Sequence, residues 1–258
     1  MHPILFKVGP FTVTTWGVFV LSGILLAVYY AAREAEKAGF RREDLYDLAF
    51  FAVLAGLVGA RLFYVATHWS EFAPDPLEIL RVWHGGMVFY GGFLFGVPAA
   101  LLFVYRRRLP VTRVADWIAP GIPLAIAVGR WGCFFNGCCY GKPTHLPWGV
   151  VFPDGAAGAQ FPGIHLHPTQ IYESLGQFLV FLFVILLKRR HDHLPPGTLF
   201  WTVAFLSPLV RFLDDFFRYY EPSQYLFGGL LTLSQAISLA LSLVALLALF
   251  RLWSGPHS

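Results

Sequence analysis

Long apolar runs, separated by short polar loops, are the main pattern along the chain. Seven of these runs are long enough, or nearly so, to cross the hydrocarbon core of a membrane as helices, which takes about 20 residues. The runs cover residues 11–32, 45–66, 87–105, 114–132, 169–187, 197–213 and 228–250. This pattern predicts an all-α fold, a polytopic membrane bundle of seven transmembrane helices that forms a single integral membrane domain over residues 1–258.

Basic residues are distributed unevenly over the loops between these runs. Of the 19 Lys and Arg, twelve lie after the first, third and fifth runs or at the C-terminal end, and four lie on the opposite side. Because Lys and Arg are enriched in cytoplasmic loops, this imbalance predicts an N-terminus outside and a C-terminus inside. The first cationic cluster follows its apolar run, which argues against a cleaved signal peptide. The longest loop, roughly 133–168, is predicted to form a small periplasmic cap.

Composition supports a membrane protein and excludes other classes. The chain is 57% hydrophobic and 13% charged, whereas soluble domains carry about 25% charged residues. The net charge of +4 comes from short, separate clusters rather than from one basic face, which excludes a nucleic-acid-binding surface. Three cysteines are too few for a disulfide framework.

Three arginines lie within or at the ends of apolar runs, and all three fall on the predicted outer side. Arg61, Arg130 and Arg211 stand near the outer ends of the second, fourth and sixth runs. An arginine in hydrocarbon costs about 2.5–3.5 kcal/mol on insertion scales, so each is a functional candidate unless it snorkels to the interface. Guanidinium groups bind phosphate through paired hydrogen bonds, and the outer leaflet supplies phosphates. The three arginines therefore predict a pocket for a phospholipid headgroup.

Two further motifs on this side have both a functional and a structural interpretation. The glycine pairs of HGGMVFYGG, Gly85–Gly86 and Gly91–Gly92, allow the close approach of a ligand or of another helix. In RFLDDFFR, Arg211 and Asp215 are four residues apart, which suits a structural ion pair as well as a catalytic carboxylate.

The stretch HPTQIYES starts the fifth run with four polar candidates, His167, Gln170, Tyr172 and Glu173. Pro168 suits the first turn of a helix. His167 is a binding residue or simply an interfacial one. Glu173 enters the bundle more deeply, where an unpaired carboxylate is costly, so it is expected to meet an arginine.

Six motifs of the chain resemble those of the bacterial prolipoprotein diacylglyceryl transferases. They are VGPFTVTTWG, LVGARLFYV, GGMVFYGG, GRWGCFFNG, HPTQIYES and RFLDDFFR, and they extend nearly end to end. The most specific piece is GR-x-G-x-F-x-N-G followed by Gly141. The resemblance implies a seven-helix inner-membrane enzyme with its chemistry at the periplasmic face. Such an enzyme moves the diacylglyceryl group of phosphatidylglycerol onto the lipobox cysteine of a prolipoprotein, forming a thioether and releasing glycerol 1-phosphate.

The resemblance also implies roles for individual residues. The candidate catalytic residues are Arg130, Arg211, Tyr90 and Cys138, and the two arginines match those the family uses around the lipid phosphate. The candidate substrate-binding residues are Arg61, Gly85, Gly86, Gly91, Gly92, Cys133, Asn136, Gly141, His167, Gln170, Tyr172, Glu173, Asp215 and Arg218. No cofactor or metal is predicted. The implied partners are phosphatidylglycerol or another anionic phospholipid, and a prolipoprotein acceptor.

Several positions depart from the family pattern. They are Trp16 (usually tyrosine), Tyr90 (usually histidine), Cys133 (usually asparagine), Cys138 (usually glutamate) and Asp215 (usually glutamate). A phenol, with an ordinary pKa near 10, is a poor general base at neutral pH. Either His84, His165 or His167 takes the proton, or arginines lower the pKa of the acceptor thiol.

The three cysteines, Cys133, Cys138 and Cys139, form C-x4-C-C at the start of the outer loop. Four interpretations are open: packing of small side chains, a disulfide from Cys133 to either of the others, a cysteine nucleophile beside Arg130, and a zinc site. Because the spacing fits none of the usual zinc templates, packing or a disulfide is favoured, then the nucleophile, then the metal.

Three functional hypotheses follow. The first is a diacylglyceryl transferase acting on phosphatidylglycerol and a lipoprotein cysteine. The second is a paralogue that uses the same lipid pocket with another acceptor, through a relay at Cys133 or Cys138. The third is a non-catalytic protein that binds or transports phospholipid.

Overall fold

The computed structural model describes residues 3–9, 11–81, 85–191 and 193–254, and most of them are helical. The helices are α1 (Thr15–Lys37), α2 (Arg42–Thr67), α3 (Trp69–Phe72), α4 (Phe89–Arg106), α5 (Val111–Ile118), α6 (Gly121–Phe135), α7 (Gly155–Gln160), α8 (Thr169–Arg190), α9 (Thr198–Asp214) and α10 (Leu233–Ser254). The strands are β1 (Ile4–Val8), β2 (Phe11–Thr14), β3 (Tyr225–Leu226) and β4 (Leu231–Thr232). Short 3-10 turns lie at Pro76–Leu80, Pro222–Gln224 and Phe227–Gly229.

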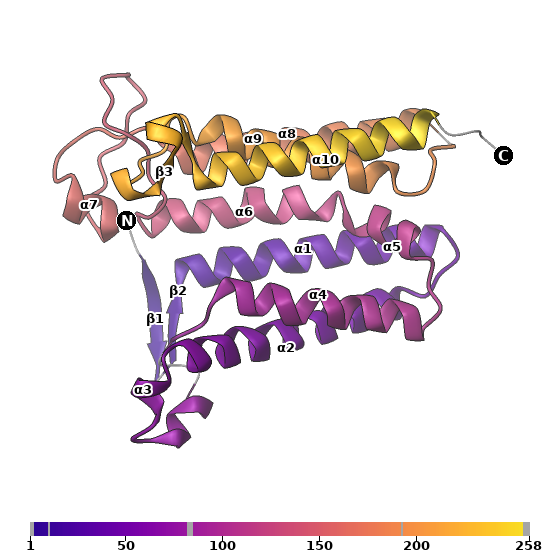
Figure 1. Ribbon diagram of the computed structural model, residues 1–258, viewed down its shortest axis with the longest axis horizontal. Coiled ribbons are helices and arrows are strands. Elements are labelled where there is room, and N and C mark those ends of the chain that lie inside the picture. Colours follow the sequence, from indigo (N-terminus) through magenta and orange to yellow (C-terminus); the bar gives the residue numbers. More distant parts are fainter. Residues whose placement is uncertain (1–2, 10, 82–84, 192, 255–258) are drawn as a thin grey trace.

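The long helices lie side by side along the longest axis of the molecule, and the hairpin of β1 and β2 gathers with α3 and α7 at one end (Figure 1). Five helical stretches of the described chain are long and apolar enough to cross a membrane, namely α1, α2, α5 with α6, α8 and α10. The other two predicted runs fall on α4, whose apolar part is shorter, and on α9, which has 17 residues. The described residues thus form a mostly helical bundle with five candidate membrane spans.

Three predicted runs differ from the structure in detail. The seventh run starts in a 3-10 turn and strand β4, so that α10 begins only at Leu233. The first run begins as strand β2, and helix α1 starts only at Thr15, where the hydroxyl of Thr14 accepts a hydrogen bond from the Gly17 N–H and caps the helix. The fourth run is two helices, α5 and α6, with Pro120 in the break. Proline lacks an N–H to donate, which explains an interruption at this place.

Small residues bring the helices into close pairs. In the α1–α6 pair, a Cβ added to Gly23 would lie 2.7 Å from the Ala125 carbonyl oxygen. In the α2–α4 pair, a Cβ added to Gly91 would lie 2.4 Å from the Gly59 carbonyl oxygen. Without a hydrophobic driving force between helices in lipid, such backbone-to-backbone packing is a main source of association.

We expect Gly59→Ala to destabilise the protein by about 1–3 kcal/mol, because the added methyl group overpacks the α2–α4 contact. A Cβ at Gly59 would lie 2.5 Å from the Phe95 Cβ and 2.6 Å from the Gly91 carbonyl oxygen. Thermal unfolding of the purified protein in detergent measures the effect. Gly56→Ala, one turn earlier on α2, is the matched control, since its Cβ would meet the nearest atom at 3.4 Å. Equal unfolding temperatures for the two variants would contradict the close contact.

Buried polar contacts hold α8 against its neighbours near one end of the bundle. The Ser174 hydroxyl donates to the Ala127 carbonyl of α6 at 2.8 Å. The Gln177 amide donates to the Ser207 carbonyl of α9 at 3.0 Å, and the Ser207 hydroxyl bonds back to the Gln177 side chain. These bonds fix the rotation of α6, α8 and α9 about their axes. The rotation of the three helices in turn determines which of their side chains face one another in the adjacent turn.

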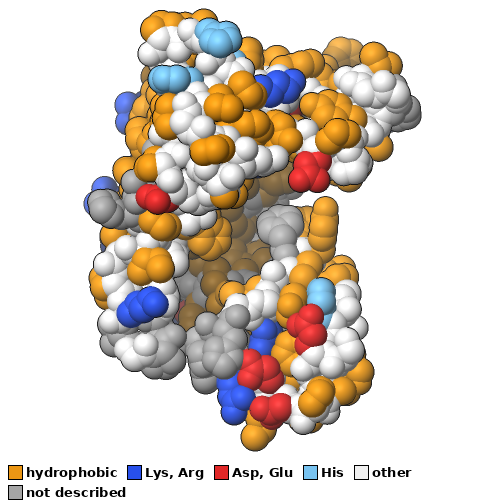
Figure 2. All heavy atoms as spheres, turned by 90° about the vertical axis from the view of Figure 1, so that its left-hand side faces the viewer, with side chains coloured by type: hydrophobic (Ala, Val, Ile, Leu, Met, Phe, Trp, Pro, Cys, Tyr) orange, Lys and Arg blue, Asp and Glu red, His pale blue; other side chains and the backbone are white. Residues whose placement is uncertain are grey.

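Figure 2 looks onto the end of the bundle that carries the β1–β2 hairpin and α7. A recess opens there between an upper and a lower part of the molecule, and hydrophobic side chains are visible inside it. At this end α2, α6 and α9 finish and α4, α8 and α10 begin. The candidate site residues named from the sequence belong to these helix ends and to the loops beyond them.

Candidate active site

Glu173 lies at the centre of a charged cluster at this end of the bundle. The residue, on the second turn of α8, is buried with 3% of its surface exposed. One of its carboxylate oxygens lies 2.8 Å from Arg130 Nη2 of α6, and the other lies 2.9 Å from Arg211 Nη1 of α9. Arg218 Nη1 lies 4.0 Å from the second oxygen. The expectation that this carboxylate meets an arginine is confirmed.

Arg211 has a second set of partners on its other side. Its Nη2 lies 3.0 Å from the Asp215 carboxylate and donates to the Tyr220 hydroxyl at 2.7 Å, and that hydroxyl donates to Asp215 at 2.7 Å. Its Nε bonds the Ser234 hydroxyl of α10 at 3.3 Å. The ion pair predicted from the spacing of Arg211 and Asp215 is present. Tyr220 and Ser234 were missed, because no sequence pattern places a loop and α10 against the end of α9.

An apolar cavity of about 590 Å³ leads away from this charged cluster between α6, α8, α9 and α10. Its lining includes Glu173 and Arg211 at the charged end, together with Ile122, Ile126, Phe200 and Val203. A cavity with a guanidinium and a carboxylate at one end and aliphatic and aromatic walls elsewhere matches an amphiphile, with a charged head and an apolar tail.

Tyr90 lines a second cavity, of about 460 Å³. Tyr220 and Ser234, which both contact Arg211, line this cavity, and Ser238 lines both this cavity and the apolar one. The candidate Tyr90 thus lines the same cavity as two side chains that contact Arg211.

Arg61 does not join the cluster, which contradicts the expectation that all three arginines share one pocket. Its buried guanidinium donates hydrogen bonds to the backbone carbonyls of Ile79 at 3.0 Å, Glu78 at 2.6 Å and Gly86 at 3.1 Å. It also lies 5.1 Å from the centre of the Phe72 ring. With its donors directed at the backbone after α3, Arg61 anchors that segment to the end of α2.

We expect Arg61→Ala to destabilise the protein by about 1–3 kcal/mol, because several backbone carbonyl groups lose their hydrogen-bond donor. Lipid binding per folded molecule should stay unchanged. Thermal unfolding and binding of phosphatidylglycerol in detergent measure the two quantities. Arg81→Ala is the control, since the Arg81 side chain is 40% exposed and pairs with Asp75 on the surface. If the Arg61→Ala protein were stable but bound lipid more weakly, Arg61 would take part in binding the headgroup.

Three glycines of HGGMVFYGG make close contacts within the protein, whereas a Cβ at Gly85 would meet no atom within 4 Å. Gly86 has φ of +76°, and a Cβ there would lie 2.8 Å from Arg61 Nη1. Gly85 also has positive φ, at +88°. Gly91 and Gly92 face the α2 backbone, as described above for the α2–α4 pair. These contacts support the helix-packing interpretation. His84, one of the histidines considered as a base, lies outside the described residues.

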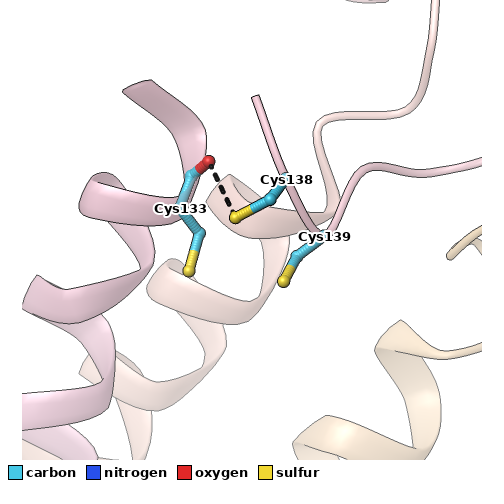
Figure 3. A group of neighbouring side chains, drawn as sticks. All are labelled: Cys133, Cys138 and Cys139. Atoms are coloured by element: carbon cyan, nitrogen blue, oxygen red, sulfur yellow. Dashed lines mark hydrogen bonds between the residues drawn. The ribbon is translucent and has the colours of Figure 1, made fainter. Parts of the chain in front are cut away.

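The cysteine loop follows α6 and lies directly beside the arginines. All three cysteines are free, so the structure contains neither of the disulfides considered from the sequence. Their Sγ atoms all lie within 4.8 Å of one another (Figure 3). Arg130 Nη1 lies 3.9 Å from the Cys133 Sγ. Cys139, which was not among the candidate site residues, lines a polar cavity of about 440 Å³ with Arg218 and Tyr220.

The start of α8 holds this loop in place. The Thr169 hydroxyl donates to the Cys139 carbonyl at 2.9 Å, and the Gln170 amide donates to the Cys138 carbonyl at 2.7 Å. The candidate Gln170 is therefore bound to the loop. Asn136 ends α6 as its C-cap, and a Cβ on Gly141 would lie 2.5 Å from the His167 Cβ. These candidates shape the loop around the thiols.

The pKa values of the thiols are shifted in different directions. Hydrogen bonds from Cys133 and Cys138, together with the charges of Arg218 and Arg130, hold the pKa of Cys139 below its usual range. The pKa of Cys138 is raised by its interactions with the other two thiols and by burial. Cys139, the thiol whose pKa is lowered, is also the one that lines the polar cavity.

His167, just before α8, and Tyr172, on its first turn, line a different cavity. Tyr172 accepts a hydrogen bond from the Trp148 indole at 2.8 Å and lies 3.2 Å from His167 Nδ1. Both line an apolar cavity of about 510 Å³ with Asp214 and Phe217. Burial and the nearby charge of Lys142 lower the pKa of His167.

The fold and the site together define a class: a mostly helical membrane protein in which partly buried arginines share a carboxylate at one end of an apolar cavity. A sequence model of the family described as prolipoprotein diacylglyceryl transferase matches residues 3–251. The chain therefore belongs to the prolipoprotein diacylglyceryl transferase family.

Relatives support this assignment over the length of the chain. The chain is 38% identical over 189 residues to a phosphatidylglycerol–prolipoprotein diacylglyceryl transferase of Synechococcus elongatus, a match that covers 73% of this chain and 65% of the relative. Proteins of the same name from Lactobacillus delbrueckii subsp. bulgaricus and Geobacter sulfurreducens are 33% and 32% identical. These matches cover 97% and 95% of this chain and 90% and 93% of the relatives.

Proposed function

We propose that this protein is a transferase that moves the diacylglyceryl group of phosphatidylglycerol onto a cysteine thiol in the lipobox of a prolipoprotein. The observation that carries the proposal is the pair Arg130 and Arg211, which hold one buried carboxylate at the mouth of an apolar cavity. The names of the relatives give the lipid and the acceptor. The paralogue and transport hypotheses find no comparable support.

The arginines bind the lipid phosphate and stabilise the charge that leaves with it. Arg130 donates to Glu173 and Cys133, and a guanidinium carries five N–H donors, so donors remain for phosphate oxygens. Arg211 is oriented by Glu173, Asp215 and Tyr220. Preorganised donors of this kind act where negative charge develops on the departing glycerol phosphate.

The chemistry is a displacement at carbon. The acceptor thiolate attacks the glyceryl carbon of the lipid, the S–C bond of the thioether forms, and the C–O bond to the phosphate breaks. The electron pair leaves with the phosphate oxygen as glycerol phosphate. The acyl chains stay in the apolar cavity lined by Ile122, Ile126 and Phe200, which keeps the glyceryl carbon near the arginines.

The proposed topology is seven membrane-crossing helices with the N-terminus outside and the C-terminus inside. The five candidate spans are joined by α4 and α9, whose 18 and 17 residues suffice at the short end of the range for a transmembrane helix, about 17–25 residues. The basic clusters lie in the loops at the end where α1, α4, α8 and α10 finish. On this topology the site faces the periplasm of a bacterial inner membrane, with residues 133–168 as its cap.

The decisive experiment is complementation of a bacterial strain depleted of its own transferase, together with an assay of the purified protein. The protein, phosphatidylglycerol and a lipobox peptide should give a thioether-linked diacylglyceryl peptide, detected by mass spectrometry. A family member that is active under the same conditions is the positive control. A well-folded protein that gives neither rescue nor thioether would refute the proposal.

A further inference from the structure

All three cysteines of the chain converge on one point next to the arginine cluster. Cys133 lies on the last turn of α6, and Cys138 and Cys139 belong to the loop that follows. Their Sγ atoms lie within 4.8 Å of one another. In a tetrahedral zinc site, where each Zn–S bond is about 2.3 Å, neighbouring sulfurs are about 3.8 Å apart. The observed spacing is therefore within about 1 Å of a metal–thiolate geometry.

The backbone is bent to bring the sulfurs together. Cys139 has φ of +61°, a left-handed conformation that is uncommon for any residue other than glycine. Gly137, two residues earlier, also has positive φ, at +64°. The hydrogen bonds from Thr169 and Gln170 hold the carbonyl groups of Cys139 and Cys138 in place. Such strain persists only where surrounding contacts maintain it, and it is concentrated at functional sites.

Charge around the thiols suits a metal–thiolate centre. Three thiolates and one divalent cation leave a net charge of −1, which needs a cation beside it when partly buried. Arg130 Nη1 lies 3.9 Å from the Cys133 Sγ, and Arg218 lines the cavity that Cys139 faces. The same cavity, about 440 Å³ and polar, gives a route to the cluster for another molecule.

We propose that Cys133, Cys138 and Cys139 bind a thiophilic divalent cation of the zinc type through three thiolates, and that the open fourth position of this ion binds the acceptor thiol. The choice of acceptor rests on the proposed function, whereas the metal site rests on the thiol geometry alone. Sites with three protein ligands and one open position are the catalytic kind of zinc site. A thiol that coordinates such an ion is deprotonated.

The proposed step keeps its atoms and electrons in balance. The acceptor thiol loses its proton to solvent as its sulfur coordinates the ion. That sulfur then forms the S–C bond with the glyceryl carbon, while the C–O bond to the phosphate breaks and its electron pair leaves on glycerol phosphate beside Arg130. No atom changes oxidation state. The ion and the arginine thus act on the attacking and the leaving group respectively.

The first test is metal binding to the full-length protein in detergent, reduced and stripped of metal. Titration with Co²⁺ should give thiolate-to-cobalt charge-transfer absorption and the intense visible bands of tetrahedral cobalt at one ion per chain, and Zn²⁺ should displace them. We expect Cys139→Ser and Cys138→Ser to weaken Zn²⁺ binding by about 100-fold. Thr112→Ser, at the opposite end of the bundle, is the control, and thermal unfolding verifies that each variant is folded.

Two results of this titration would overturn the metal site. One is the absence of thiolate-to-cobalt bands in a folded, fully reduced protein. The other is equal alkylation of all three thiols with and without Zn²⁺. Protection of the three thiols by Zn²⁺ in the wild type, and its loss in Cys139→Ser, is the expected outcome.

The second test concerns the acceptor. A lipobox peptide should shift the cobalt bands, and the same peptide with serine in place of its cysteine should not. Removal of the metal should lower the transfer rate by about 100-fold or more, as expected for the loss of proton-removing catalysis, and Zn²⁺ should restore it. Two results would overturn the role of the metal ion in acceptor activation. One is a cobalt spectrum that does not change when the cysteine peptide is added, and the other is a transfer rate that does not change when the metal is removed. Metal and peptide binding without any thioether product would instead contradict the proposed function.

Discussion

Replacing Arg130 with alanine is expected to lower the rate of diacylglyceryl transfer by about 1,000-fold. The side chain reaches Glu173 and the cysteine cluster at once, at 2.8 Å and 3.9 Å, so it stands where phosphate and acceptor meet in the proposed mechanism. Removing one preorganised donor to a developing negative charge costs about 100- to 1,000-fold, and loss of the whole guanidinium corresponds to the upper end. Single-turnover transfer from phosphatidylglycerol to a lipobox peptide measures the effect.

Two further variants make this result specific. Arg130→Lys keeps the charge but loses the planar pair of donors, and we expect it to recover only part of the rate. Arg107→Ala removes an arginine at the opposite end of the bundle, where it pairs with Asp44 and Asp47, and should transfer at the wild-type rate. An Arg130→Ala protein that retains more than about a tenth of the activity would contradict the role in transition-state stabilisation.

Glu173→Gln is expected to reduce the free energy of unfolding by about 3–5 kcal/mol. Removing one partner of a buried ion pair leaves the other charge uncompensated, and here Arg130 and Arg211 both lose their carboxylate while Arg218 remains nearby. Unfolding of the purified protein in mixed micelles measures the change. Because the arginines then lack an anion, glycerol phosphate should stabilise this variant more than it stabilises the wild type.

Glu36→Gln is the matched control for this prediction. Glu36 forms an ion pair with Arg42, but both side chains are about half exposed, and surface ion pairs contribute about 0–1 kcal/mol. A Glu173→Gln protein as stable as Glu36→Gln, with no added effect of glycerol phosphate, would show that Glu173 does not organise the arginines.

The positions of the helices follow closely from the hydrophobic pattern, and the departures have local causes. Every predicted run falls on a helix, because burial in lipid requires about 20 consecutive apolar residues whatever the neighbours are. The run at 114–132 corresponds to two helices, α5 and α6, because a proline interrupts the helical hydrogen bonding. The first residues of the run at 11–32 form strand β2, which pairs with β1.

The candidate site was predicted in composition but only partly in arrangement. Arg130, Arg211 and Glu173 meet as the cost of buried charge requires. Arg61 is also an arginine at the outer end of an apolar run, yet it donates its hydrogen bonds to backbone carbonyls after α3. A sequence shows that an arginine ends an apolar run; it does not show which way the helix is rotated.

The sequence by itself determined which segments are helical and apolar, where their charged ends lie and which family the motifs resemble, because these depend on patterns within about 20 neighbouring residues. Only the tertiary structure decided which arginines share Glu173 and that three thiols converge beside Arg130. The reason is physical. Helix rotation is set by backbone contacts such as Gly59 against Gly91, and the thiols meet through a left-handed turn at Cys139. The first is packing between segments distant in the chain, and the second is a local turn that Thr169 and Gln170 of α8 hold in place.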